Sequence, residues 1–209
     1  MRLHKIMRLV AAAGLMAGVA GMAQAESSFQ NASGSLTATA HLDFQITVPH
    51  VLYLRVGTAP AGYATGSTVD LISFTVPAAN VGDGTVVAAT SGSGDLGNGT
   101  VTARVMGNGG NVTFTSTTTG AISDGNGDTV SFSKLAVSSA VNTSTTALPH
   151  PTFVDGGVSS ALTLTATNHV VNQDAKWTFT YLNNSILGAG TYGGVNTNNS
   201  RVTYTAVMP

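Results

Sequence analysis

The chain has no cysteine among its 209 residues. This absence excludes disulfide bonds, zinc sites built from thiolates and cysteine nucleophiles. The stability of the folded protein must therefore come from core packing and the hydrogen bonds of the sheets.

Charge is also scarce, because Asp, Glu, Lys and Arg make up only 8% of the residues. Beyond residue 25 the chain carries five cationic and nine acidic side chains, so the net charge of that part is −4. A basic patch for nucleic acid is therefore absent, and we expect no nucleic-acid partner. A surface with so few charges has little to oppose association, so self-assembly is consistent with this composition.

The N-terminal residues predict a secretory signal peptide. A basic start that includes Arg2 and Lys5 precedes the apolar run Leu9–Met22, and Ala23-Gln24-Ala25 matches a cleavage site. No later stretch reaches the ~20 apolar residues of a membrane-spanning helix, so we expect no integral membrane segment. We expect residues 1–25 to be removed on export across the inner membrane, which leaves residues 26–209 in the periplasm, at the cell surface or outside the cell.

The longest pattern in the chain is an alternation of apolar and polar residues over 36–56. Two residues is the side-chain period of a β-strand, so we expect a long strand with one buried face and a bend at Pro49. The preceding polar residues 26–35 predict a flexible arm. The apolar positions within the first part of this stretch are Leu36, Ala38, Ala40, Leu42 and Phe44.

Shorter alternating segments follow through the rest of the chain, separated by turns rich in Gly, Asn and Pro. No segment after residue 25 shows the periodicity of an amphipathic helix, so the sequence predicts an all-β protein with about nine to eleven strands. The fold class is a β-sandwich forming one domain over 26–209, with a Greek-key, immunoglobulin-like topology as one option. Expected strands outside the long one lie at 69–76, 85–90, 100–106, 111–117, 129–137, 158–166, 176–182 and 201–207. A tight hairpin is expected at Gly107–Gly110.

The segment Asp124-Gly-Asn-Gly-Asp128 admits two interpretations. Asp124, Asn126 and Asp128 place oxygen atoms at alternate positions, which is the spacing that calcium loops use. A full EF-hand loop has a Glu ligand at its twelfth position, which is Leu135 here. Asp, Asn and Gly are also favoured in hairpin turns, because they adopt the backbone conformations that such turns require. The sequence favours the turn and keeps calcium as the alternative, with no other cofactor expected.

The sequence contains no recognisable catalytic motif. His41, His50, His150 and His169 lack the spacing of a metal-binding motif, although His41 lies two residues from Asp43. No Gly-x-Ser-x-Gly motif occurs, and Glu26 is the single Glu, so a pair of Glu residues for glycoside hydrolysis is excluded. We therefore expect a protein that is not an enzyme, with no catalytic residues.

Two C-terminal motifs resemble a known family. Ala189-Gly-Thr-Tyr192 followed by Arg201-Val-Thr-Tyr-Thr-Ala206 is similar to the closing strands of bacterial fimbrial subunits, both chaperone–usher pilins and spore-coat-U-like secreted proteins. The resemblance implies a structural surface protein that polymerises by β-strand donation, with itself or related surface subunits as partners. The donor implied here is the arm with residues 36–44. The chain departs from the family in having no disulfide and in ending with Val207-Met208-Pro209.

A monomeric binding module for glycans or other ligands is the alternative function. Such a module needs a closed sandwich with outward aromatic side chains. Tyr53, Tyr63 and Tyr192 are the candidates for this role.

Overall fold

The computed structural model describes residues 27–209, and the predicted signal peptide lies outside the described residues. The described chain forms two units, residues 27–48 and residues 49–209. Within residues 27–209 there is no helical segment with the length and apolar character that crossing a lipid bilayer requires.

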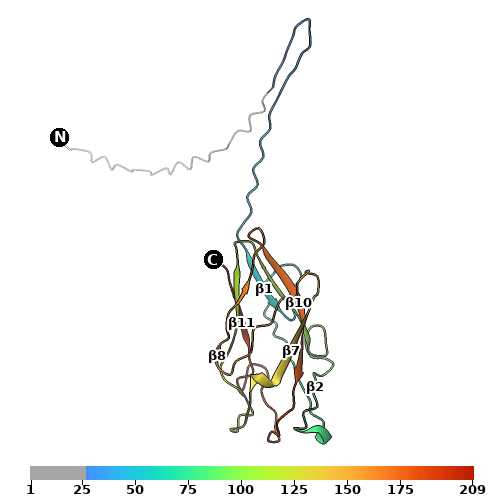
Figure 1. Ribbon diagram of the computed structural model, residues 1–209, viewed down its shortest axis with the longest axis vertical. Helices are drawn as coiled ribbons and strands as arrows, with labels where there is room; N and C mark the ends of the chain where they lie inside the picture. The colour runs from blue at the N-terminus through green and yellow to red at the C-terminus, as the bar shows by residue number, and fades with distance from the viewer. Residues whose placement is uncertain (1–26) are drawn as a thin grey trace, which may run out of the picture. The chain divides into compact units, whose positions relative to one another are not determined.

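Residues 27–48 contain no regular secondary structure, and their side chains are exposed throughout. Figure 1 draws them as an extended chain with a bend. Phe44 and Ile46 are 85% and 86% exposed. We call residues 27–48 the arm.

Residues 49–209 form an all-β sandwich with eleven strands, all paired antiparallel, which confirms the predicted fold class (Figure 1). One sheet has the order β1-β3-β10-β2, and β7 also pairs with β10. These strands are β1 (Leu52–Val56), β2 (Val87–Ala88), β3 (Thr100–Gly107), β7 (Leu135–Ala140) and β10 (Val171–Tyr181).

The second sheet has the order β11-β4-β8, and β9 also pairs with β4. A separate hairpin joins β5 to β6, and two short 3₁₀ turns, η1 (Ala78–Asn80) and η2 (Phe132–Lys134), complete the elements. The remaining strands are β4 (Val112–Thr118), β5 (Ile122–Ser123), β6 (Thr129–Val130), β8 (Gly157–Val158), β9 (Leu162–Leu164) and β11 (Thr203–Val207).

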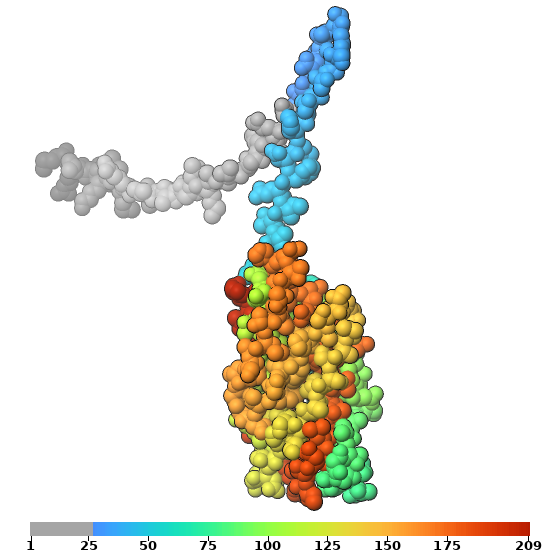
Figure 2. All heavy atoms as spheres, viewed as in Figure 1, coloured from blue at the N-terminus to red at the C-terminus, as the bar shows by residue number. Residues whose placement is uncertain are grey.

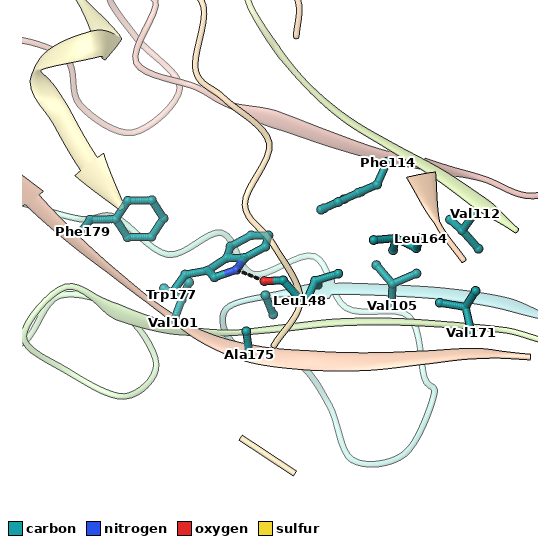
Figure 3. Packing of buried hydrophobic residues seen from close by; sticks show 11 residues of the cluster. Val101, Val105, Val112, Phe114, Leu148, Leu164, Val171, Ala175, Trp177 and Phe179 are labelled. Carbon is teal, nitrogen blue, oxygen red and sulfur yellow. Dashed lines mark hydrogen bonds between the residues drawn. The ribbon is translucent and has the colours of Figure 1, made fainter. Parts of the chain in front are cut away.

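The core lies between the two sheets and follows the predicted alternation. The inward positions of β3, Val101, Ala103 and Val105, are buried, and so are Trp177, Phe179 and Tyr181 of β10. Trp177 stacks on Phe114 with ring centroids 6.1 Å apart, and its indole N–H donates to the Leu148 carbonyl at 2.9 Å (Figure 3). This bond satisfies the one polar group of a fully buried ring.

The long strand predicted over 36–56 is wrong for most of its length. Only 52–56 forms a strand, which pairs with β3 from Leu52 opposite Gly107 to Val56 opposite Ala103. Alternation reports which face a side chain takes in a ladder, but it does not supply the partner strand. No such partner exists for residues 36–48 within the described chain, so their apolar side chains stay exposed.

The predicted hairpin at Gly107–Gly110 is also wrong. β3 lies between β1 and β10, whereas β4 pairs with β11, β8 and β9, so this turn carries the chain from one sheet to the other. The Asn108 side chain instead holds the root of the arm, because its Oδ1 accepts from Val51 N at 2.8 Å and its Nδ2 donates to the Pro49 carbonyl at 2.7 Å.

Three other predicted strands differ in the structure. The 158–166 strand is divided into β8 and β9, which both pair with β4. The 129–137 strand is interrupted, because η2 separates β6 from β7. The Ser131 hydroxyl starts η2 by accepting from Ser133 N at 3.0 Å. Residues 69–76 form no strand, and a single bridge joins Phe74 to Ala89.

Candidate functional site

Residues 49–209 carry an open groove with a volume of about 1240 Å³. It runs beside β1 and is bordered by the segment 57–76 and by residues 185–204. β1 pairs only with β3, and β11 pairs only with β4, so each is an edge strand of its sheet. β1 and β11 come close to each other, and the groove therefore follows one open side of the sandwich.

Apolar side chains form the walls of the groove. They come from β1, the 69–76 segment, η2, β10, β11 and the adjoining loops, and several of them also pack on the core. An apolar groove of this kind exposes to water a surface that association can cover. The main apolar lining residues are Leu54, Val56, Ile72, Phe74, Phe132, Phe153, Phe179, Tyr181, Val202 and Tyr204.

One wall, residues 69–76, has apolar side chains on two faces and few backbone hydrogen bonds to other segments. Val69 and Leu71 are 58% and 45% exposed, while Ile72 and Phe74 pack against the core. The Asp70 carboxylate holds the start of this segment by accepting from Thr58 N at 2.7 Å. Main-chain groups that lack a ladder partner are the usual template for an added strand.

The opposite wall is fixed by a buried asparagine. The Oδ1 atom of Asn183 accepts from Gly82 N at 3.0 Å, and its Nδ2 donates to the Asn80 carbonyl at 2.6 Å. Gly82 has φ +70°, and a Cβ there would come within 2.8 Å of Ile186 N, so this contact requires glycine. The segments around residues 82 (green) and 186 (red) lie beside each other in Figure 2.

His150 lies behind the groove wall in a cluster of aromatic rings. Its Nε2 shares a 2.7 Å hydrogen bond with the Tyr204 hydroxyl, and its ring meets Trp177 edge-on at 4.7 Å and Phe153 at 4.6 Å. Burial lowers the pKa of His150 to about 4, against an opposing effect of the Pro151 backbone. Burial also raises the pKa of Tyr204 far above its usual range. The pair is therefore neutral at pH 7.

The sequence gives little sign of this role for His150. Its neighbours Pro149 and Pro151 indicate only a loop, and every ring that contacts it comes from a distant part of the chain.

The predicted calcium residues form the turn between β5 and β6. The Asp124 Oδ1 accepts from Asn126 N at 2.8 Å and from Asp128 N at 3.0 Å, and Asp124 N donates to the Asp128 carbonyl. The hydrogen bond from Asn126 N is the largest of the effects that lower the pKa of Asp124, which keeps its carboxylate ionised. Within residues 27–209 no group of three or more His, Cys, Asp or Glu is placed to hold a metal ion.

The other predicted residues are distributed over separate places. Leu36, Ala38, Ala40, Leu42 and Phe44 all lie in the arm with exposed side chains. Tyr53 and Tyr63 come together, with ring centroids 5.1 Å apart, whereas the Tyr192 hydroxyl donates to the Gly188 carbonyl at 3.0 Å. The structure thus joins two of the three candidate tyrosines.

Comparisons of this chain with protein-family models, with curated proteins and with solved structures find no match.

Proposed function

We propose that this protein is a secreted, non-enzymatic structural subunit that assembles by β-strand donation. In this proposal, residues 36–48 of one copy enter the groove of the next copy. The observation that carries the proposal is the open apolar groove in residues 49–209 of a chain whose arm exposes an alternating apolar face.

The arm has the chemistry that the groove requires. Its even positions from 36 to 48 are all apolar, and its odd positions are all polar or charged. An added strand places alternate side chains into one surface and uses its main chain to pair with an exposed edge. The wall at 69–76 offers main-chain groups for such pairing, because the bridge from Phe74 to Ala89 is its one ladder contact within the described residues.

Burial of the apolar side chains of the arm in a partner supplies part of the free energy of association. Leu42, Phe44, Ile46 and Val48 are each at least 70% exposed, and full burial of such a side chain is worth about 1.5–3 kcal/mol. Ordering the backbone costs about 1–2 kcal/mol per residue, so side-chain burial alone does not hold the arm in place. The hydrogen bonds to an edge strand are therefore needed as well, and a groove beside an edge supplies both.

The symmetry of the contact determines the product. The arm and the groove are different surfaces of the chain, so their pairing between copies is heterologous. Such a contact gives a filament when the rotation between copies does not close into a ring. We therefore expect a linear polymer.

The proposal is tested with variants of the two faces of the arm in the mature protein. Phe44→Asp places a charge on the apolar face, whereas Gln45→Asp places the same charge on the polar face next to it. Wild type and Gln45→Asp should form filaments visible by negative stain and large species by size exclusion with light scattering. Phe44→Asp should remain monomeric.

A second measurement uses the arm as a peptide. A peptide of residues 36–48 added to Phe44→Asp protein should raise the temperature of unfolding, because a ligand that binds only the folded state stabilises it by about 2.7 kcal/mol at 100 times its Kd. A wild-type protein that stays monomeric at high concentration, together with a peptide that leaves unfolding unchanged, would rule out strand donation.

A further inference from the structure

The outer face of the first sheet gathers most of the cationic side chains. Of the five Lys and Arg residues within 27–209, three lie on this face: Arg55 on β1, Arg104 on β3 and Lys176 on β10. Arg55 and Arg104 are directly opposite in the ladder. Like charges in this position repel, so the sheet needs a compensating negative charge there.

Only one of these two arginines has such a partner. Arg55 forms an ion pair with Asp95 at 3.0 Å, and its Nε donates to the Gly57 carbonyl at 2.8 Å. Arg104 donates from Nη2 to the neutral amide of Asn172 at 3.0 Å. Its buried Nε has no acceptor among the described residues.

The nearest acid in the ladder is already occupied. Asp174 lies opposite Arg104 on β10, but its carboxylate accepts from Thr143 N at 2.9 Å and from Ser144 N at 2.8 Å. Burial opposes its ionisation, yet the hydrogen bonds from Thr143 and Ser144 outweigh burial and hold the pKa of Asp174 well below its usual range. This carboxylate is therefore committed to the 143–144 loop and forms no ion pair with Arg104.

Aromatic rings adjoin the uncompensated guanidinium. The Cζ of Arg104 lies 5.6 Å from the centroid of the Tyr63 ring, and Tyr63 meets Tyr53 in an edge-to-face arrangement at 72°. Tyr63 remains 60% exposed. The face thus combines an accessible aromatic ring with a cation that forms no ion pair within residues 27–209.

We propose that Arg104, Tyr63 and Tyr53 bind an anionic sugar, a pyranose that carries a carboxylate or a phosphate. The guanidinium would pair with the anionic group, since its planar fork suits both oxyanions. The exposed Tyr63 ring would pack against the apolar C–H face of the sugar. A neutral sugar would lack the ion pair and bind more weakly.

This site overlaps the border of the assembly groove at its two tyrosines, but not at its arginine. Tyr53 and Tyr63 border the groove, but Arg104 is not among its lining residues. A variant of Arg104 therefore tests sugar binding without touching the surface that would receive the arm.

The test uses the full mature protein and isothermal titration calorimetry with polygalacturonate, and with dextran as the neutral polysaccharide. Polygalacturonate should bind more tightly than dextran. Binding should weaken at least about tenfold in Arg104→Gln and in Tyr63→Ala, and it should weaken as salt is raised. Lys134→Gln is the matched control, because Lys134 is bonded to Asn184 at 2.8 Å outside this face.

Glucuronate and glucose 6-phosphate distinguish a carboxylate from a phosphate as the preferred group. Circular dichroism confirms that each variant is folded. The inference is overturned if wild-type protein binds none of these probes, if dextran binds as well as polygalacturonate, or if Lys134→Gln loses as much affinity as Arg104→Gln. Filament formation by Arg104→Gln then reports on strand donation independently.

Discussion

His150 shows how strongly one residue depends on rings that lie far away in the sequence. Trp177 and Tyr204 come from different sheets, and both contact the imidazole. The ring therefore joins the two sheets at a position where the groove wall meets the core. A charge placed there would be enclosed by aromatic side chains, which solvate it poorly.

We predict that acid destabilises the protein through His150. The unfolded chain takes up a proton near pH 6.5, whereas folded His150 has a pKa of about 4. The free energy of unfolding should therefore fall as the pH drops from about 6.5 to about 4, by up to roughly 3 kcal/mol, and this contribution is fully present only above pH 6.5. Urea unfolding followed by the fluorescence of Trp177, the single tryptophan, measures it.

Two variants assign this effect to His150. His150→Phe should be less stable at neutral pH, because the bond to Tyr204 is lost, but its stability should vary little over that pH window. His169→Asn alters an exposed loop residue with φ +65°, a conformation that Asn tolerates, and it should keep the wild-type pH dependence. An unchanged slope in His150→Phe would assign the effect elsewhere.

At the scale of elements, variants of the β5–β6 turn distinguish a hairpin turn held by hydrogen bonds from a calcium site. Asp124→Ala removes the acceptor for the N–H groups of Asn126 and Asp128, so we expect the midpoint of thermal unfolding to fall by a few degrees at most. Asp124→Asn keeps a side-chain oxygen as acceptor, so its unfolding midpoint should fall less. Added calcium should leave the midpoint of wild type unchanged, since the turn already uses Asp124 Oδ1.

The calcium titration is decisive in either direction. A rise in the unfolding midpoint that depends on calcium concentration and is reversed by a chelator would establish a calcium site in wild type. Its loss in Asp128→Asn would place that site at this turn.

The sequence predicts some elements well, and the reason is physical. β3 and β10 alternate and have one face against the core, so the burial of Val101, Val105 and Trp177 follows from their periodicity. The same periodicity over 36–51 predicts a strand that does not form, because a strand also requires a partner. Pairing between strands is long-range information that a local pattern does not contain.

The candidate site also has one part that the sequence predicts and one part that it does not. The apolar positions of the arm are readable from the sequence, since they need only local alternation. The groove is not, because its walls come from β1, from 69–76 and from residues 185–204, which meet only in the folded chain. The arrangement of Arg104 with Tyr63 likewise depends on a loop that returns to the sheet.

At the scale of the whole molecule, we predict that assembly and sugar binding respond differently to salt. Strand donation would bury apolar side chains and main-chain bonds in a protein of low charge, so filament yield should stay constant up to ~0.5 M NaCl. Binding of polygalacturonate should weaken over the same range. Light scattering and calorimetry on one preparation compare the two, and filaments that dissolve in salt would contradict the proposed apolar contact.

The Asn108 side chain determines how the protein would respond to a mechanical load. It holds Pro49 and Val51 where the arm continues into β1, and β1 is paired to β3 over five residues. A pull transmitted through the arm would enter the sheet at the Leu52 end of β1, where the first load falls on the bonds of Asn108 and then on the five-residue pairing of β1 with β3. Asn108 would act as the first point of yield, and its removal would be expected to lower the force at which the strand detaches.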